Sequence, residues 1–145
     1  MSGPALRTVK SHQAIHETAW NEADEVLRLA KTLRASSDDV RFLQVVEVFL
    51  EIVEARILAH AAEEEHGLYR EWLRANGQNQ PLIDSLVVEH EALRGLAQAM
   101  EQAMVRQQYE TVVSTMSELL QVSAAHSQHE EKILGTIALA GEASL

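Results

Sequence analysis

Apolar side chains recur at alternating intervals of three and four residues along four long stretches of the chain. This is the period of a helix face that packs against neighbouring helices. Only two prolines and six glycines occur among the 145 residues, so little interrupts the pattern. The spacing predicts helices over residues 6–35, 39–75, 81–105 and 109–139.

Three short polar segments separate the predicted helices. Residues 36–39 offer side chains that cap helix N-termini, and residues 76–81 place a glycine near one helix end and a proline near the next start. Residues 106–108 form a weaker break. Such short connections favour antiparallel neighbours. We therefore predict an all-α, antiparallel up-down-up-down four-helix bundle, with one domain over residues 1–145.

The charge balance excludes two classes of partner. Twelve Lys and Arg against 22 Asp and Glu give a formal net charge of -10, which repels nucleic acid and anionic membrane surfaces. The absence of cysteine excludes disulfides and thiolate metal sites. No apolar run is long enough for a membrane span and no signal-peptide pattern is present, so we expect a cytoplasmic protein. The sequence leaves the oligomeric state open.

Two of the predicted helices carry histidine and glutamate within their apolar rows. These are His60 with Glu64, and His126 with Glu130. Burying a carboxylate among aliphatic side chains is costly unless it is protonated, paired or bound to a cation. No Lys or Arg occupies the same rows, and residues four apart share a helix face. A metal ion is the predicted counter-charge. The alternative is a hydrogen-bond network in which these side chains satisfy one another.

The other two helices add histidines at the same height. Counted from the predicted turns at about 1.5 Å per residue, His16 is level with His60, and His90 is level with His126. His12 lies in the same row as His16 and is level with the carboxylate of helix 39–75, so height alone does not separate these two. Four imidazoles and two carboxylates favour a pair of metals such as iron, manganese or zinc over calcium or magnesium.

Three segments carry this constellation: HAAEEEHGLY at 60–69, EHE at 89–91 and HSQHEEKIL at 126–134. Together they resemble the hemerythrin-like, or HHE cation-binding, domains over nearly the whole chain. The resemblance implies two non-haem iron ions in an oxo- or hydroxo-bridged di-iron centre, and a small ligand such as O2, H2O2 or NO. It implies His16 and His60 on one iron, His90 and His126 on the other, and Glu64 and Glu130 as bridges.

The chain departs from the oxygen-carrying hemerythrins that it resembles in two places. Those proteins have a second histidine four residues after the ligand of the third helix, where this chain has Arg94. Their last carboxylate is an aspartate five residues after its histidine, whereas Glu130 follows His126 by four. The departures favour redox chemistry or iron and oxygen sensing over reversible oxygen carriage. A metal-free interaction bundle is the remaining alternative.

Several polar residues adjoin the predicted ligands. We expect solvent to surround four of them, Glu63, Glu65, His66 and Glu131. His129 and Glu89 stay open between packing or surface roles and a part in the metal site. These expectations depend only on where each residue lies around its own helix.

Overall fold

Helices make up the regular structure of the computed structural model, which describes residues 9–143, the last five by their backbone alone. The all-α prediction is confirmed for this part of the chain. Residues 6–8, where the first helix was expected to begin, lie outside it. The elements in chain order are α1 (Val9–Ala35), α2 (Asp39–Ile52), the π-helix η2 (Val53–Leu58), α3 (Ala59–His66), α4 (Leu68–Ala75), the 3-10 turn η3 (Gly77–Asn79), α5 (Gln80–Val105) and α6 (Tyr109–Ala143).

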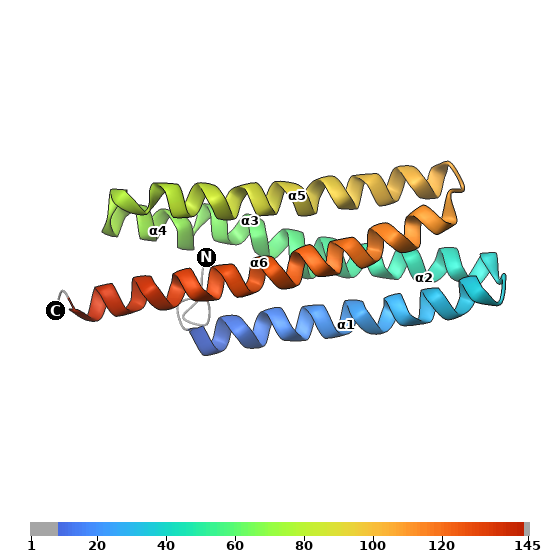
Figure 1. Ribbon diagram of the computed structural model, residues 1–145, viewed down its shortest axis with the longest axis horizontal. Helices are drawn as coiled ribbons and strands as arrows, with labels where there is room; N and C mark the ends of the chain where they lie inside the picture. Colours follow the sequence, from blue (N-terminus) through green and yellow to red (C-terminus); the bar gives the residue numbers. More distant parts are fainter. Residues whose placement is uncertain (1–8, 144–145) are drawn as a thin grey trace.

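Figure 1 shows the long helices side by side along one axis, with the chain reversing its direction at each connection. The succession α2, η2, α3 and α4 acts as one long arm that returns along α1. The helix α1 packs along α2 and α6, and α5 packs along α6. None of the described helices combines the length and the apolar character needed to cross a membrane.

The connections form at the predicted breaks. The side chain of Asp38 accepts a hydrogen bond from the backbone N–H of Arg41 and caps α2. The side chain of Asn76 accepts one from the N–H of Gln78, and a proline stands in the first turn of α5. These caps satisfy backbone groups that the first turn of a helix leaves without partners.

Two apolar clusters fill the interior, with a polar layer between them. The larger cluster includes Phe42, Phe49, Met100, Met116 and Leu119. The smaller cluster comprises Leu68, Tyr69, Trp72, Ile83, Leu86, Ile133 and Leu134. The buried polar residues that lie between these clusters along each helix are His12, Glu64, His90, His126 and Glu130. The fold thus holds five ionisable groups away from water in one layer.

The π-helix η2 keeps the long second arm in register with the core. The backbone N–H of Ala59 bonds to the carbonyl of Glu54, five residues back. Buried residues follow at Phe49, Val53, Ile57 and Ala61, each four after the last. Four residues turn a regular α-helix about 40° beyond a full turn, so this row would drift away from the core. The wider turn of η2 absorbs the excess. It precedes the two polar core residues of α3.

A length change in η2 tests this role. Deleting the exposed Ala55 should convert the segment to α-helix and leave His60 and Glu64 facing inward. Inserting one alanine after Ala55 should rotate the following residues by about 100° and remove them from the layer. We expect iron binding to survive the deletion and fail in the insertion, as measured by iron per chain after anaerobic loading, with circular dichroism to check helicity. Equal loss in both variants would contradict the register argument.

Candidate metal centre

The polar layer contains two overlapping groups of side chains whose ligand atoms lie within 4.8 Å of one another. Site A consists of His12, His16, His60, Glu64 and Glu130, and site B of Glu64, His90, His126 and Glu130. All six residues predicted from the sequence are therefore brought together. His12, which the sequence left as an alternative to His16, joins them. The two glutamates belong to both sites.

Each shared carboxylate divides its two oxygens between the sites. Glu64 Oε2 lies 2.9 Å from His12 Nε2, and Glu64 Oε1 lies 3.5 Å from His90 Nε2. Glu130 Oε1 accepts a hydrogen bond from His12, and Glu130 Oε2 lies 3.4 Å from His126 Nε2. A carboxylate in this position can bind two ions at once, one through each oxygen.

Hydrogen bonds on the outer side of site B determine which nitrogens point inward. His90 Nδ1 donates to Glu65 Oε2 at 2.7 Å, and His126 Nδ1 donates to Glu89 Oε1 at 2.6 Å. A carboxylate only accepts, so each Nδ1 carries the hydrogen, and in a neutral imidazole Nε2 then holds a lone pair. The two Nε2 atoms are 3.0 Å apart. Facing lone pairs would repel, so a proton or a cation must lie between them. Burial opposes protonation of His126, but hydrogen bonds to Glu130 and Glu89 raise its pKa, so a proton takes this place when no metal is bound.

Site A shows the same need for a cation. His60 Nε2 and Glu64 Oε2 are buried and have no hydrogen-bond partner of suitable geometry among the described residues. The rings of His12, His16 and His60 surround this point, with centroids 4.4 to 5.4 Å apart. A buried polar atom without a partner costs about 1–3 kcal/mol. A metal ion bound by these atoms would remove that cost.

Comparison with known families agrees with this geometry. The family model described as the hemerythrin HHE cation binding domain matches residues 15–138. The chain belongs to this family. No curated protein and no solved structure gave a match. The matched region includes His16 and the five other predicted residues, whereas His12 lies before its start.

In this hemerythrin-like chain, the two shared carboxylates have opposite protonation tendencies. Burial, and then the neighbouring Glu130, raise the pKa of Glu64 well above its ordinary value. Burial also opposes ionisation of Glu130, but hydrogen bonds to Glu64, His12 and His126 hold its pKa well below the ordinary value. Without a metal the pair therefore holds one proton and one negative charge, because two adjacent buried charges repel.

The histidine on α3 is suited to donate a lone pair at neutral pH. Burial, and then the nearby His16 and His12, lower the pKa of His60 to about 4. The imidazole of His60 therefore stays neutral in the range where cells operate. Metal binding at this residue displaces no proton.

Three carboxylates outside the layer contact the imidazoles that face it. Glu65 and Glu89 bond to the histidines of site B, and Glu131 Oε2 accepts from His16 Nδ1 at 3.2 Å. We expected Glu65 and Glu131 to be solvated, but both are partly buried. The signal for them was the doubled glutamate: each follows a shared carboxylate by one residue and reaches a neighbouring helix.

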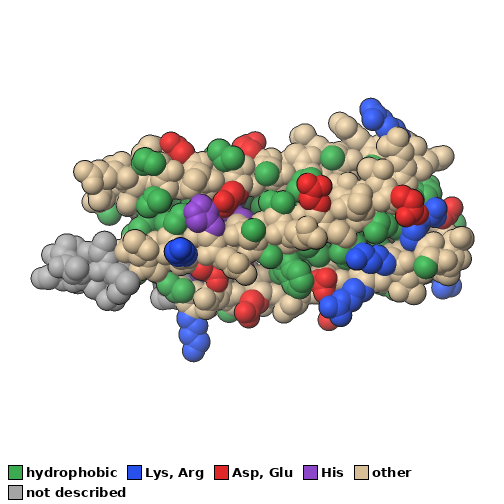
Figure 2. All heavy atoms as spheres, in the orientation of Figure 1, with side chains coloured by type: hydrophobic (Ala, Val, Ile, Leu, Met, Phe, Trp, Pro, Cys, Tyr) green, Lys and Arg blue, Asp and Glu red, His purple; other side chains and the backbone are tan. Residues whose placement is uncertain are grey.

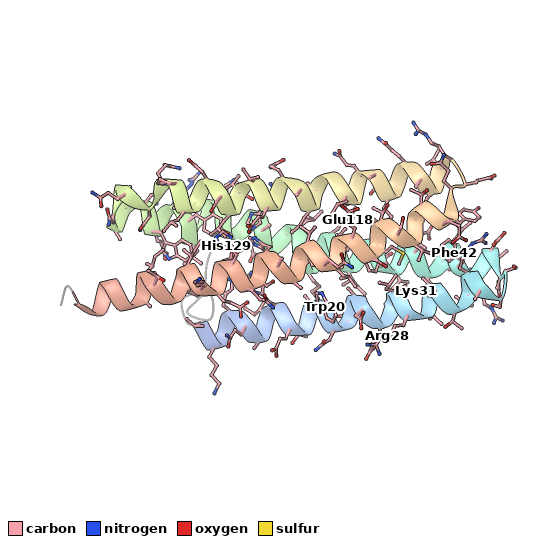
Figure 3. The ribbon with its side chains drawn as sticks, viewed as in Figure 1. Trp20, Arg28, Lys31, Phe42, Glu118 and His129 are labelled. Carbon is pink, nitrogen blue, oxygen red and sulfur yellow. The ribbon has the colours of Figure 1, made fainter. Side chains whose placement is uncertain are left out.

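The remaining neighbours lie farther out. His129 donates from Nδ1 to Glu89 Oε2 at 2.8 Å, in the seam between α5 and α6 where Figure 2 shows a histidine at the surface and Figure 3 labels this residue. Glu63 and His66 are exposed, as expected. Arg94, which stands where oxygen-carrying relatives have a histidine, donates to Glu65 Oε2 at 2.7 Å. Arg94 therefore holds the Glu65 carboxylate in place and is not part of site B.

Removing one outer carboxylate should weaken metal binding without touching a ligand atom. Glu65→Gln is expected to lower the affinity for iron about tenfold or more, because His90 loses the charged acceptor that orients it. The exposed Glu63→Gln, two residues away, is the matched control and should bind as the wild type does. Competition with a chromogenic chelator measures both affinities. Equal affinities in the two variants would contradict the orienting role of Glu65.

The shared carboxylates should make the metal-free protein sensitive to pH. Because the folded pKa of Glu64 is raised above 4.5, the folded chain keeps a proton that the unfolded chain loses, so stability falls as pH rises above 4.5. Glu64→Gln removes this dependence. With a chelator present to remove metal, we expect the free energy of unfolding of the Glu64→Gln variant to exceed that of the wild type by about 1 kcal/mol or more at pH 8. The difference should be smaller at pH 5. Urea titrations measure the free energy of unfolding of both proteins. The same dependence on pH in the variant and the wild type would contradict a raised pKa at Glu64.

Proposed function

We propose that the protein holds two non-haem iron ions in a carboxylate-bridged centre, within an antiparallel up-down-up-down four-helix bundle. The centre would bind or react with a small ligand such as O2, H2O2 or NO. The proposed ligands are His12, His16 and His60 on the ion of site A, His90 and His126 on the ion of site B, and Glu64 and Glu130 as bridges, with an oxo or hydroxo group between the ions.

One observation carries the proposal. The outward hydrogen bonds of His90 and His126 turn two Nε2 atoms to within 3.0 Å of each other beside two carboxylates, and the buried His60 Nε2 has no hydrogen-bond partner among the described residues. An ordinary core network would have a donor opposite each acceptor. Imidazole nitrogen with carboxylate oxygen is a donor set that suits iron. Membership of the HHE cation-binding family supports the same interpretation.

The space beside the layer limits the size of the ligand. A pocket is lined by the polar residues His16, His60, Glu64, His90 and His126 and by a wall that includes Ile57, Ala61 and Leu93. About 20 Å³ of it is open to the centre of a water-sized molecule. A single water needs about 10–15 Å³ by this measure, so the space beside the layer is that of one or two water molecules and is too small for a larger organic substrate.

The protein groups around the layer control protons and water. Iron in these sites would supply electron transfer to or from the small ligand. Tyr69 is buried and donates its hydroxyl hydrogen to Glu130, and burial raises its pKa so that it keeps this proton. The ring of Tyr69 stacks on Trp72 and His90. The smaller apolar cluster therefore closes one side of the layer against water and leaves the pocket as the open side.

The same geometry favours a second candidate, an iron- or oxygen-sensing module without turnover. Without a cation the layer holds two imidazole Nε2 atoms 3.0 Å apart, a His60 Nε2 with no hydrogen-bond partner among the described residues, and a protonated Glu64. Metal binding would relieve all three costs, so metal occupancy should be coupled to the order of the bundle. A partner protein could then detect the difference between the two states.

Iron loading tests the function. We expect about two iron ions per chain after anaerobic addition of ferrous iron, and an oxo-to-iron charge-transfer band after exposure to air. Both signals should be lost in His126→Ala and Glu130→Ala and kept in His129→Ala, which changes a histidine outside the layer. A colourless, iron-free protein would overturn the proposal. A metal-free form as helical and as heat-stable as the loaded form would speak against sensing alone, since bound metal raises the melting temperature of a coupled fold.

A further inference from the structure

Arg56 lies where the pocket beside the metal layer meets the surface. It lines this pocket together with His60, Glu64 and His90. It also lines an outer groove, formed with Ala14, Ile15, Thr18 and Ala19 of α1. Arg56 and Ala19 are the two residues that the pocket and the groove share. A small molecule that enters from this groove therefore passes Arg56. A second groove, which shares His16 and Ser127 with the pocket, includes Glu17 and Glu131 and offers an anion no positive charge.

The guanidinium is held loosely. Its ion pair with Glu22 Oε2 has a distance of 3.7 Å, and the side chains of Arg56 and Glu22 are 52% and 43% exposed. Exposed pairs of this kind contribute about 0–1 kcal/mol. Arg56 is thus able to turn from Glu22 towards another anion at little cost.

The charge of Arg56 is unusual in its surroundings. No other Lys or Arg is among the residues that line the pocket or the groove. The chain as a whole carries a formal charge of -10, so its general field repels anions. A guanidinium stays charged at every pH that the protein meets. One fixed positive charge at the opening of a narrow pocket offsets that repulsion where a ligand enters.

We propose that Arg56 selects small inorganic anions for the metal layer over neutral diatomic molecules. The ligand class is a small inorganic anion, such as superoxide, hydroperoxide or azide. This inference rests on the proposed function, because it concerns what reaches the iron. Neutral O2 and NO carry no charge for the guanidinium to attract, so Arg56 should leave their entry unchanged.

Azide binding to the ferric, iron-loaded protein tests the proposal by stopped-flow absorbance. Arg56→Gln should lower the association rate constant about threefold to tenfold at 10 mM ionic strength, and the difference should shrink at 0.5 M salt. Arg56→Lys should restore most of the rate. Glu22→Gln should raise it, because Arg56 loses its competing partner. NO binding to the ferrous protein should change less than twofold in every variant.

Arg28→Gln is the matched control. Arg28 also carries one positive charge in an ion pair, with Asp24 at 2.9 Å, but its side chain is 78% exposed and points away from the bundle. Equal slowing of azide in both Gln variants would assign the effect to net charge and overturn the proposal. If Arg56→Gln slowed NO binding as much as azide binding, the effect would be steric, and the proposal would also be overturned. An iron-loaded Arg56→Gln protein with an unchanged azide rate overturns this inference alone, whereas failure to take up iron overturns the proposed function with it.

Discussion

The burial of two carboxylates opposite one another is the constraint on which the rest of the structure depends. Glu64 and Glu130 are fully buried between two apolar clusters, and no Lys or Arg occupies their rows. Bundle packing alone would favour leucine at both places. The layer therefore stabilises the fold only when a cation, or a proton as its weaker substitute, sits between them. Five histidines from four helices face this point. The candidate metal ligands are therefore also the residues whose burial destabilises the metal-free fold.

The carboxylates around the layer determine which nitrogen of each imidazole faces inward. Outer carboxylates hold the hydrogen on Nδ1 of His16, His90 and His126, so that Nε2 turns inward. Site A has three imidazoles and site B two, since Arg94 bonds to Glu65 where a relative would add a histidine. The site with fewer donors has more room for an external ligand. The pocket reaches both sites, since His16 and His60 line it as well as His90 and His126, so only the number of donors distinguishes them.

The sequence was sufficient for the four helical stretches and for bringing the six predicted residues into one layer, because both follow from periodicity and from distance to a turn. It missed that the stretch 39–75 is divided by η2 and by a break at Gly67, and that the last helix continues to Ala143. His60 and Glu64 could be placed inward from their row alone. Glu65 and Glu131 could not, since their roles depend on how a neighbouring helix is rotated, which no single row records. The π-helix left a trace in the sequence, because buried residues follow one another at three successive intervals of four. Which residues are buried becomes known only from the structure, so the wider turn could not be predicted. That these residues hold metal, the single domain over residues 1–145 and the cytoplasmic location stay predictions.

The two sides of the layer differ in how they are closed against solvent. On one side Tyr69 bonds to Glu130 and stacks on Trp72, and the cluster beyond them is closed by apolar packing. On the other side, the wall includes small residues such as Ala19 and Ala61, and the π-helix contributes Ile57 and Arg56. The pocket adjoins the groove beside η2 through Ala19 and Arg56, and the groove between α1 and α6 through His16 and Ser127, whereas the Tyr69 side is closed. The irregular turn that keeps His60 in register thus also lines one of the two ways by which a ligand would enter.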